Sequence, residues 1–204
     1  MTGLAASPGI VIGRAYVVYS ESVRILPHAI SDEGLEPEIE RFRKAIEESK
    51  QEILAIQRNF REETSESALA EIFDTHIHLL EDLLLTGETI KKVREEKKNV
   101  EYIFSKNLEA LQEKFSSVDD EYLRQRWHDI QDVSGRILRK LLRREKQSLS
   151  RLNEEVVVIS HDLTPADTAS MDRKNVLAFA TDAGGRTSHT VIMAKALRIP
   201  LWSA

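Results

Sequence analysis

The sequence contains no cysteine. This absence excludes a disulfide framework, a cysteine-ligated zinc site and a thiol nucleophile within the chain. No apolar run approaches the roughly 20 residues that a membrane-spanning helix needs. The N-terminal residues show no basic segment followed by a long apolar one, which is the pattern of an export signal. We therefore expect a cytoplasmic protein that does not associate with membranes.

Proline and glycine are scarce in the middle of the chain. Residues 38–164 contain no proline and only two glycines, Gly87 and Gly135. Because both residue types disfavour helix interiors, this scarcity predicts a long helical segment. Residues 36–145 hold 25 acidic and 20 basic side chains, so the net charge of -5 lies within this segment. An acidic balance of this kind argues against nucleic-acid binding.

Apolar residues in this segment recur at steps of three and four, which indicates amphipathic helices. Ser117 and Asp120 are predicted to form the capping box of the last helix. Four helices with short connections favour an antiparallel bundle. The predicted helices span 36–62, 65–85, 89–115 with a break near Asn99, and 119–144.

The two flanks of the helical segment have a different pattern. Short runs rich in β-branched residues predict strands, and the sequence Thr164-Pro165-Ala166-Asp167 has the pattern of a helix capping box with proline at the first position. Strands that alternate with helices indicate an α/β fold. The predicted strands are Ile10–Ile12, Ala15–Tyr19, 155–160 and 175–180.

These patterns divide the chain into three parts. Residues 1–30 are the first part of an α/β domain, residues 31–146 are an inserted helical bundle, and residues 147–204 are the second part of the α/β domain. The predicted fold class is therefore α/β plus all-α.

The densest cluster of chemically useful residues follows the last predicted strand. Gly184 and Gly185 permit close approach of the backbone to a ligand. Thr187 or Ser188 can cap the next helix, which places His189 in its first turn. The whole segment is Thr181-Asp182-Ala183-Gly184-Gly185-Arg186-Thr187-Ser188-His189-Thr190.

The first turn of a helix favours anions. It exposes unpaired backbone N–H groups and the positive end of the helix dipole, which suit a phosphate group. The same field favours the neutral, nucleophilic form of His189. Arg186, Thr187 and Ser188 add hydrogen-bond donors for phosphoryl oxygens. We therefore expect His189 to accept a phosphoryl group covalently.

This segment resembles the phosphohistidine signature shared by Enzyme I of the bacterial sugar phosphotransferase system, pyruvate phosphate dikinase and phosphoenolpyruvate synthase. Four more segments resemble Enzyme I in particular, and they follow one another in order along nearly the whole chain. They are Ala6–Ala15, His76–Asp82, Asp119–Leu123 and Asp162–Pro165. The chain is similar to the N-terminal part of Enzyme I.

The resemblance implies a swivelling phosphohistidine α/β domain with an inserted four-helix bundle, truncated at its C-terminal end. In Enzyme I a histidine takes a phosphoryl group from phosphoenolpyruvate and passes it to a small histidine-containing phosphocarrier protein. His189 matches this histidine, and Thr168 matches a threonine that orients its imidazole. The residues expected to surround the phosphate are Gly184, Gly185, Arg186, Thr187 and Ser188.

In Enzyme I the helical insert is the docking platform for the phosphocarrier. Residues 62–90 contain eight acidic residues and no lysine or arginine, which suits a basic partner. His76 and His78 are spaced i,i+2 and point apart on a helix, so no metal site is expected. The contact candidates that match by motif position are Asp74, His76, Leu79, Asp82, Leu85 and Arg126.

Members of the family continue into a C-terminal barrel with the phosphoenolpyruvate site, a Mg²⁺ site, a catalytic cysteine and the dimer interface. The resemblance therefore implies no cofactor bound by these 204 residues, phosphoenolpyruvate and Mg²⁺ only through the missing barrel, and a monomer that exchanges phosphoryl groups with the carrier. Two alternatives stay open. One is the phosphohistidine domain of a dikinase or phosphoenolpyruvate synthase, and the other is a non-catalytic remnant that only docks the phosphocarrier.

Overall fold

The computed structural model describes residues 4–18, 24–63, 67–81, 83–116, 120–144, 149, 152–182 and 189–203, without the side chains of residues 4, 60–63, 67–71, 83–85, 121–122, 124–125 and 189. The chain forms two compact units. A helical unit comprises residues 23–55 and 71–146, and a sheet unit comprises residues 1–22, 56–70 and 147–204.

This division differs from the predicted one in two places. The helical unit begins at residue 23 instead of 31, and residues 56–70 group with the sheet unit. The sequence pattern placed 56–70 in the insert because that segment is helical. Periodicity reports the secondary structure of a segment, whereas it does not report which unit the end of a helix packs with.

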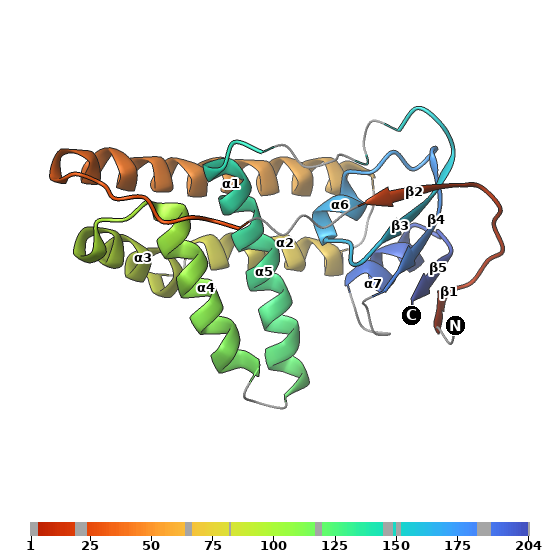
Figure 1. The fold of residues 1–204 in the computed structure, drawn as a ribbon. Helices are drawn as coiled ribbons and strands as arrows, with labels where there is room; N and C mark the ends of the chain where they lie inside the picture. Colours follow the sequence, from red (N-terminus) through yellow and green to blue (C-terminus); the bar gives the residue numbers. More distant parts are fainter. Residues whose placement is uncertain are drawn as a thin grey trace. The chain divides into compact units, whose positions relative to one another are not determined.

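The described helices between β2 and β3 number five, where four were predicted (Figure 1). The predicted break near Asn99 is confirmed, because Lys97 adopts a left-handed backbone angle of φ 49° and separates two helices. The predicted helix over 65–85 was too long. The observed helices are α1 (Leu35–Glu63), α2 (Ser67–Leu80), α3 (Leu83–Glu96), α4 (Val100–Ser116) and α5 (Glu121–Leu141), after the short 3-10 helix η1 (Asp32–Gly34).

Asp120 caps the start of α5. Its Oδ1 accepts a hydrogen bond from the backbone N–H of Leu123 at 3.2 Å, which is the bond of a helix N-cap. Ser117, the other half of the predicted capping box, lies outside the described residues. The predicted capping role is therefore seen for Asp120, and the part assigned to Ser117 stays a prediction.

Asn99 fastens the break between α3 and α4 to the segment that precedes α1. Its Oδ1 accepts a hydrogen bond from the backbone N–H of His28 at 2.6 Å, and its Nδ2 donates to the carbonyl of Leu26 at 3.3 Å. The carbonyl of Asn99 also accepts from the N–H of Ile103. A buried amide with both ends satisfied holds two distant segments in one arrangement.

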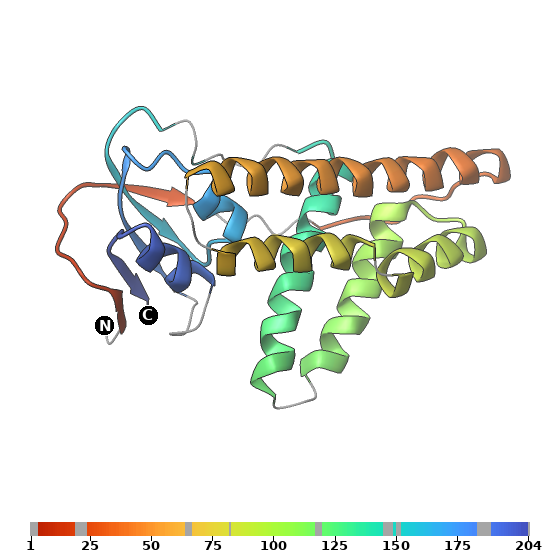
Figure 2. The ribbon, with the colours of Figure 1, turned by 180° about the vertical axis from the view of Figure 1, so that it is seen from behind.

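The core of the helical unit contains the apolar stripe of α1 and the first turns of α4. Phe42 and Phe104 pack with their ring centroids 5.3 Å apart, and both are fully buried. Ser49 occupies one position of the α1 stripe and donates its hydroxyl proton to the carbonyl of Ala45 at 2.7 Å. Both views show α4 and α5 running side by side (Figures 1 and 2).

Glu38 on α1 caps the first turn of α4. Its carboxylate accepts a hydrogen bond from the backbone N–H of Val100 at 2.7 Å and two more from Arg41 at 2.7 and 3.0 Å. Burial alone would raise the pKa of Glu38, but the hydrogen bonds from Arg41 and Val100 outweigh it and lower the pKa below its ordinary value. Arg41 also binds Glu101.

Acid is expected to destabilise the helical unit through Glu38. A carboxyl whose pKa is lowered by folding stabilises the folded state above its unfolded pKa of about 4.3, and this contribution is lost as the pH falls through the folded pKa. In Glu38→Gln the difference in unfolding free energy between about pH 7 and about pH 3 should shrink by about 1 kcal/mol. Urea titrations followed by circular dichroism measure it.

Glu40→Gln is the matched control, because Glu40 is exposed and lies 3.5 Å from Arg43 on the same helix. It is expected to follow the wild-type pH dependence. An equal change in the two variants would contradict the role assigned to Glu38.

The sheet unit is an α/β structure, as predicted. Its strands are ordered β1-β5-β4-β3-β2, with β1 antiparallel to β5 and all other neighbours parallel. Helix α6 (Pro165–Ala169) connects β3 to β4, and α7 (His189–Ala196) connects β4 to β5. The strands are β1 (Leu4–Ser7), β2 (Arg14–Val18), β3 (Val156–Ser160), β4 (Val176–Thr181) and β5 (Leu201–Ser203).

The predicted strand at Ile10–Ile12 was wrong, and β1 and β5 were not predicted. Ile10 and Ile12 are 98% and 96% exposed in the connection between β1 and β2. Gly9 before them has φ 152°, and a side chain there would collide with the ring of Pro200. The chain therefore turns at Gly9, and the β-branched residues that follow it have no neighbouring strand.

Candidate functional site

The candidate site lies at the carboxyl edge of β3 and β4. The two strands are parallel, and Ser160 is paired with Thr181 at their ends. The backbone N–H of Asp182 donates to the carbonyl of Ser160 at 3.3 Å. Because ligands of open α/β sheets bind outside the carboxyl ends of the strands, the connections to α6 and α7 start where a ligand is expected.

Helix α6 starts with the predicted capping box. The Oγ1 of Thr164 accepts from the N–H of Asp167 at 3.3 Å, and the carboxylate of Asp167 accepts from the N–H of Thr164 at 3.0 Å. Pro165 occupies the first helical position. The box satisfies two backbone donors that would otherwise be unpaired, and it fixes the direction in which α6 leaves the carboxyl edge.

Thr168 is buried on α6. Its hydroxyl donates to the carbonyl of Pro165 at 3.0 Å and lies 3.3 Å from the carbonyl of Thr164. A hydroxyl has one proton to donate, so this hydroxyl must rotate before it can donate to an imidazole. The predicted orienting role of Thr168 stays a prediction, because the side chain of His189 lies outside the described residues.

Helix α7 begins at His189, which confirms the prediction that this residue lies in a first helical turn. The next residue, Thr190, is buried and donates its hydroxyl proton to the carbonyl of Leu163 at 2.8 Å. This bond fastens the start of α7 to the connection between β3 and α6. All five residues expected to surround the phosphate lie outside the described residues: Gly184, Gly185, Arg186, Thr187 and Ser188.

Two of the predicted docking contacts are contradicted by the structure, because their side chains are buried. His76 and Leu79 are 1% and 3% exposed, because they face the core of the helical unit with Phe73 and Leu80. Asp74 on the same helix is exposed, and Arg126 on α5 is partly exposed. The side chains of Asp82 and Leu85 lie outside the described residues.

His76 faces two buried carboxylates of α5. Its Nε2 lies 3.4 Å from Oδ1 of Asp129, and its Nδ1 lies 3.5 Å from Oδ2 of Asp132. Sequence analysis missed Asp129 and Asp132, although their spacing of three along α5 places them on one face with buried Ile130 and Val133 nearby. An acidic residue at the edge of an apolar stripe was the available signal.

Arg136 extends this buried group of charges. The side chain of Arg136 is 3% exposed. Its guanidinium lies 2.5 Å from Oε1 of Glu52 on α1 and 3.9 Å from Oδ2 of Asp132. Glu52 also accepts from Lys140 at 2.8 Å. Burial would raise the pKa of Glu52, but the hydrogen bond from Lys140 and the charges of Arg136 and Lys140 lower it. These charges crosslink α1, α2 and α5.

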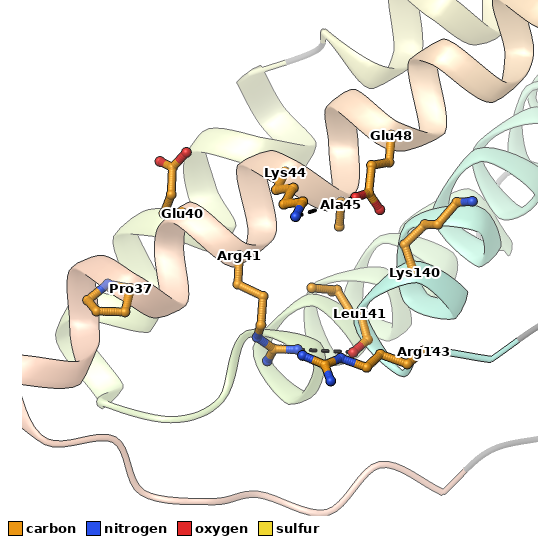
Figure 3. A pocket seen from close by; sticks show the side chains of 9 residues that line it. All are labelled: Pro37, Glu40, Arg41, Lys44, Ala45, Glu48, Lys140, Leu141 and Arg143. Atoms are coloured by element: carbon orange, nitrogen blue, oxygen red, sulfur yellow. Dashed lines mark hydrogen bonds and ion pairs between the residues drawn. The ribbon is translucent and has the colours of Figure 1, made fainter.

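A cavity of ≈ 580 Å³ lies between α1 and the end of α5 (Figure 3). Arg41 in its wall is already occupied by Glu38, Glu101 and the carbonyl of Leu141 at 3.0 Å. The cavity is lined by residues of both charges, namely Pro37, Glu40, Arg41, Lys44, Ala45, Glu48, Lys140, Leu141 and Arg143. Because Arg41, Lys44 and Lys140 are paired with Glu38, Glu48 and Glu52 of α1, respectively, we assign the cavity to helix packing.

Within the described ranges, no helix is long and apolar enough to cross a membrane. The same part of the chain contains no group of three or more histidine, cysteine, aspartate or glutamate residues that could hold a metal ion.

Two family models match the chain. The family model of the PEP-utilising enzyme N-terminal domain matches residues 2–126, and that of the PEP-utilising enzyme mobile domain matches residues 152–201. The chain is 39% identical over 198 residues to the phosphoenolpyruvate-protein phosphotransferase of Bacillus sp. (strain S) and 37% identical over 200 residues to that of Bacillus subtilis (strain 168). These alignments cover 97% and 98% of this chain but only 34% and 35% of the relatives.

Two solved structures share the fold. A solution structure of Enzyme I (nEIt) matches with a TM-score of 0.76 and 43% identity, over 98% of this chain and 80% of that one. The N-terminal domain of the nitrogen Enzyme 1 matches with a TM-score of 0.64 and 23% identity, over 98% and 82%. The chain therefore belongs to the PEP-utilising enzymes, and it corresponds to the N-terminal part of Enzyme I, about a third of the length of the phosphoenolpyruvate-protein phosphotransferases that it matches.

Proposed function

We propose that these 204 residues carry the carrier-exchange half of the Enzyme I reaction, in which His189 receives a phosphoryl group from a phosphorylated histidine phosphocarrier and returns it. The observation that carries the proposal is the start of α7 at His189, at the end of the connection that leaves the carboxyl edge of β4. A histidine in a first helical turn combines a nucleophilic nitrogen with backbone donors for phosphoryl oxygens.

The transfer step is a displacement at phosphorus. A ring nitrogen of His189 forms a new N–P bond while the N–P bond of the carrier phosphohistidine breaks, and the electron pair of that bond remains on the carrier imidazole. No water or redox partner is consumed. The role of the protein is to hold the two imidazoles in line and to stabilise the charge on the transferring group.

Docking of the carrier is assigned to the segment from Asp74 on α2 to Glu88 on α3, whose sequence has acidic residues but no lysine or arginine. Asp74, Glu81 and Glu88 are exposed there, and such a surface attracts a basic partner over a distance of about 10 Å at moderate salt. The buried His76 and Leu79 are left out of this surface. Arg126 and Asp82 remain candidate contacts from the match to the family motif.

A two-arm labelling experiment tests this proposal. In the first arm, the phosphocarrier is labelled on its histidine, separated from the enzyme that labelled it, and mixed with the protein. We expect an acid-labile, base-stable label on the 204-residue chain. In the second arm, labelled phosphoenolpyruvate and Mg²⁺ are supplied without carrier, and we expect no label. The second expectation rests on the alignment, which covers only about a third of the length of the relatives.

The outcomes separate the competing functions. Label from phosphoenolpyruvate alone would refute the half-reaction. Carrier binding without transfer would favour the docking remnant. Transfer of the label to a small molecule in place of the carrier would favour a dikinase-type domain. No feature in the described part of the structure supports that alternative.

A further inference from the structure

His161 and Asp182 form an exposed pair at the carboxyl edge of the sheet. His161 directly follows β3, and Asp182 directly follows β4. The Nδ1 of His161 lies 3.6 Å from Oδ2 of Asp182, and the two side chains are 69% and 75% exposed. The pair therefore lies where both connections leave the sheet, and it is open to a docked molecule.

The start of α7 is bonded to the same connection that carries His161. Thr190 donates its hydroxyl proton to the carbonyl of Leu163, and Leu163 follows His161 by two residues. Two residues of extended chain span at most about 7 Å. The backbone of His161 is thus only a short distance along the chain from the residue that anchors the first turn of α7.

The described carboxyl edge is rich in negative charge. Asp162, Asp167 and Asp182 lie on the two connections, where Asp162 accepts from the N–H of Leu163 and Asp167 belongs to the capping box of α6. A phosphoryl group carries about two negative charges, so these carboxylates oppose its arrival. Among the described residues of 161–168 and 181–182, His161 is the one side chain that can carry a positive charge.

The facing carboxylate distinguishes the two ring nitrogens of His161. Asp182 faces Nδ1, at 3.6 Å, so Nε2 is the ring nitrogen turned away from this carboxylate. An imidazolium has an N–H donor on both nitrogens, and hydrogen bonds from charged donors to phosphoryl oxygens are short and strong.

We propose that His161, held beside Asp182, is a second imidazole of the phosphoryl-transfer edge, whose protonated form stabilises the transferring phosphoryl group without itself being phosphorylated. This inference rests on the proposed function, because it assigns a role in the same transfer. No proton is exchanged with the phosphoryl group in this role, so the N–P bonds that form and break are those of His189 and the carrier.

The test compares His161→Gln, which removes the charge, with His161→Lys, which restores one. With phosphorylated carrier as donor, His161→Gln should slow single-turnover transfer about three- to tenfold, whereas His161→Lys should stay within about twofold of wild type. The affinity for unphosphorylated carrier, measured by calorimetry, should be unchanged.

His28→Gln is the matched control, since His28 is an exposed histidine that belongs to the helical unit. It should transfer at the wild-type rate. A wild-type rate for His161→Gln would overturn the inference, as would a loss that His161→Lys fails to restore or a loss that appears only in carrier affinity. If phosphorylated carrier does not label the wild-type protein, the proposed function is overturned instead, so the two failures are distinguishable.

Discussion

Replacing His189 with alanine is expected to abolish phosphorylation of the chain by phosphorylated carrier, with a loss of at least about a thousandfold in transfer rate. The imidazole supplies the atom that bonds to phosphorus, and alanine leaves no nucleophile at the start of α7. The helix itself should persist, because its buried residues Val191, Met193 and Ala194 are unchanged. Acid-labile label per mole of protein, together with circular dichroism, measures both.

The control for this prediction is His128→Ala, an exposed histidine of α5. It should be labelled like the wild type. Retained acid-labile label in His189→Ala would place the phosphorylated histidine elsewhere in the chain. If His189→Ala loses both the label and its helix content, the labelling experiment is repeated with His189→Gln. In that case only acid-labile label on His189→Gln would count against His189.

Replacing Arg136 with alanine is expected to lower the free energy of unfolding by about 3–5 kcal/mol. The guanidinium is 3% exposed, and its removal leaves Asp132 buried without its nearby cation and takes one of two cations from Glu52. A buried charge without a partner costs far more than a surface ion pair contributes. Urea-induced unfolding followed by circular dichroism gives the difference.

Two further variants separate charge from packing. Arg136→Met fills much of the same volume without a charge, and it should remain at least about 2 kcal/mol less stable than wild type. Arg94→Ala breaks an exposed pair with Glu36 at 2.9 Å and should cost at most about 1 kcal/mol. Similar losses in Arg94→Ala and Arg136→Ala would contradict the importance of the buried charges.

The predicted elements that held were those with a strong local signal. The α6 capping box needs only Thr164, Pro165 and Asp167, which are adjacent in sequence, and the break near Asn99 follows from one polar residue between apolar stripes. The start of α7 at His189 was predictable because glycines, hydroxyl residues and a strand before them leave few other places for a helix to begin. Local chemistry decides such features.

The features that were missed depend on distant partners. The β-branched Ile10–Ile12 run was predicted as a strand, yet Gly9 turns the chain and the strand lies at Leu4–Ser7, where it pairs with β5. His76 lies three residues after Phe73 and four before Leu80, a spacing that places it on the apolar face of α2, but its pairing with Asp129 and Asp132 of α5 could not be inferred from that helix. A single sequence without homologues shows the period of a pattern, but it does not show which face meets a charged neighbour.

The parallel pairing of β2 with β3 has a consequence for how the chain folds. Strand β2 ends at Val18 and strand β3 begins at Val156, so 137 residues lie between the two neighbouring strands in sequence. Closing a flexible loop of that length costs about 4 kcal/mol of chain entropy before any strand contact is gained. Contacts of such long range form slowly, whereas helical contacts form quickly. The helical segment is therefore expected to order first, and the sheet that positions His189 is expected to be completed late in folding.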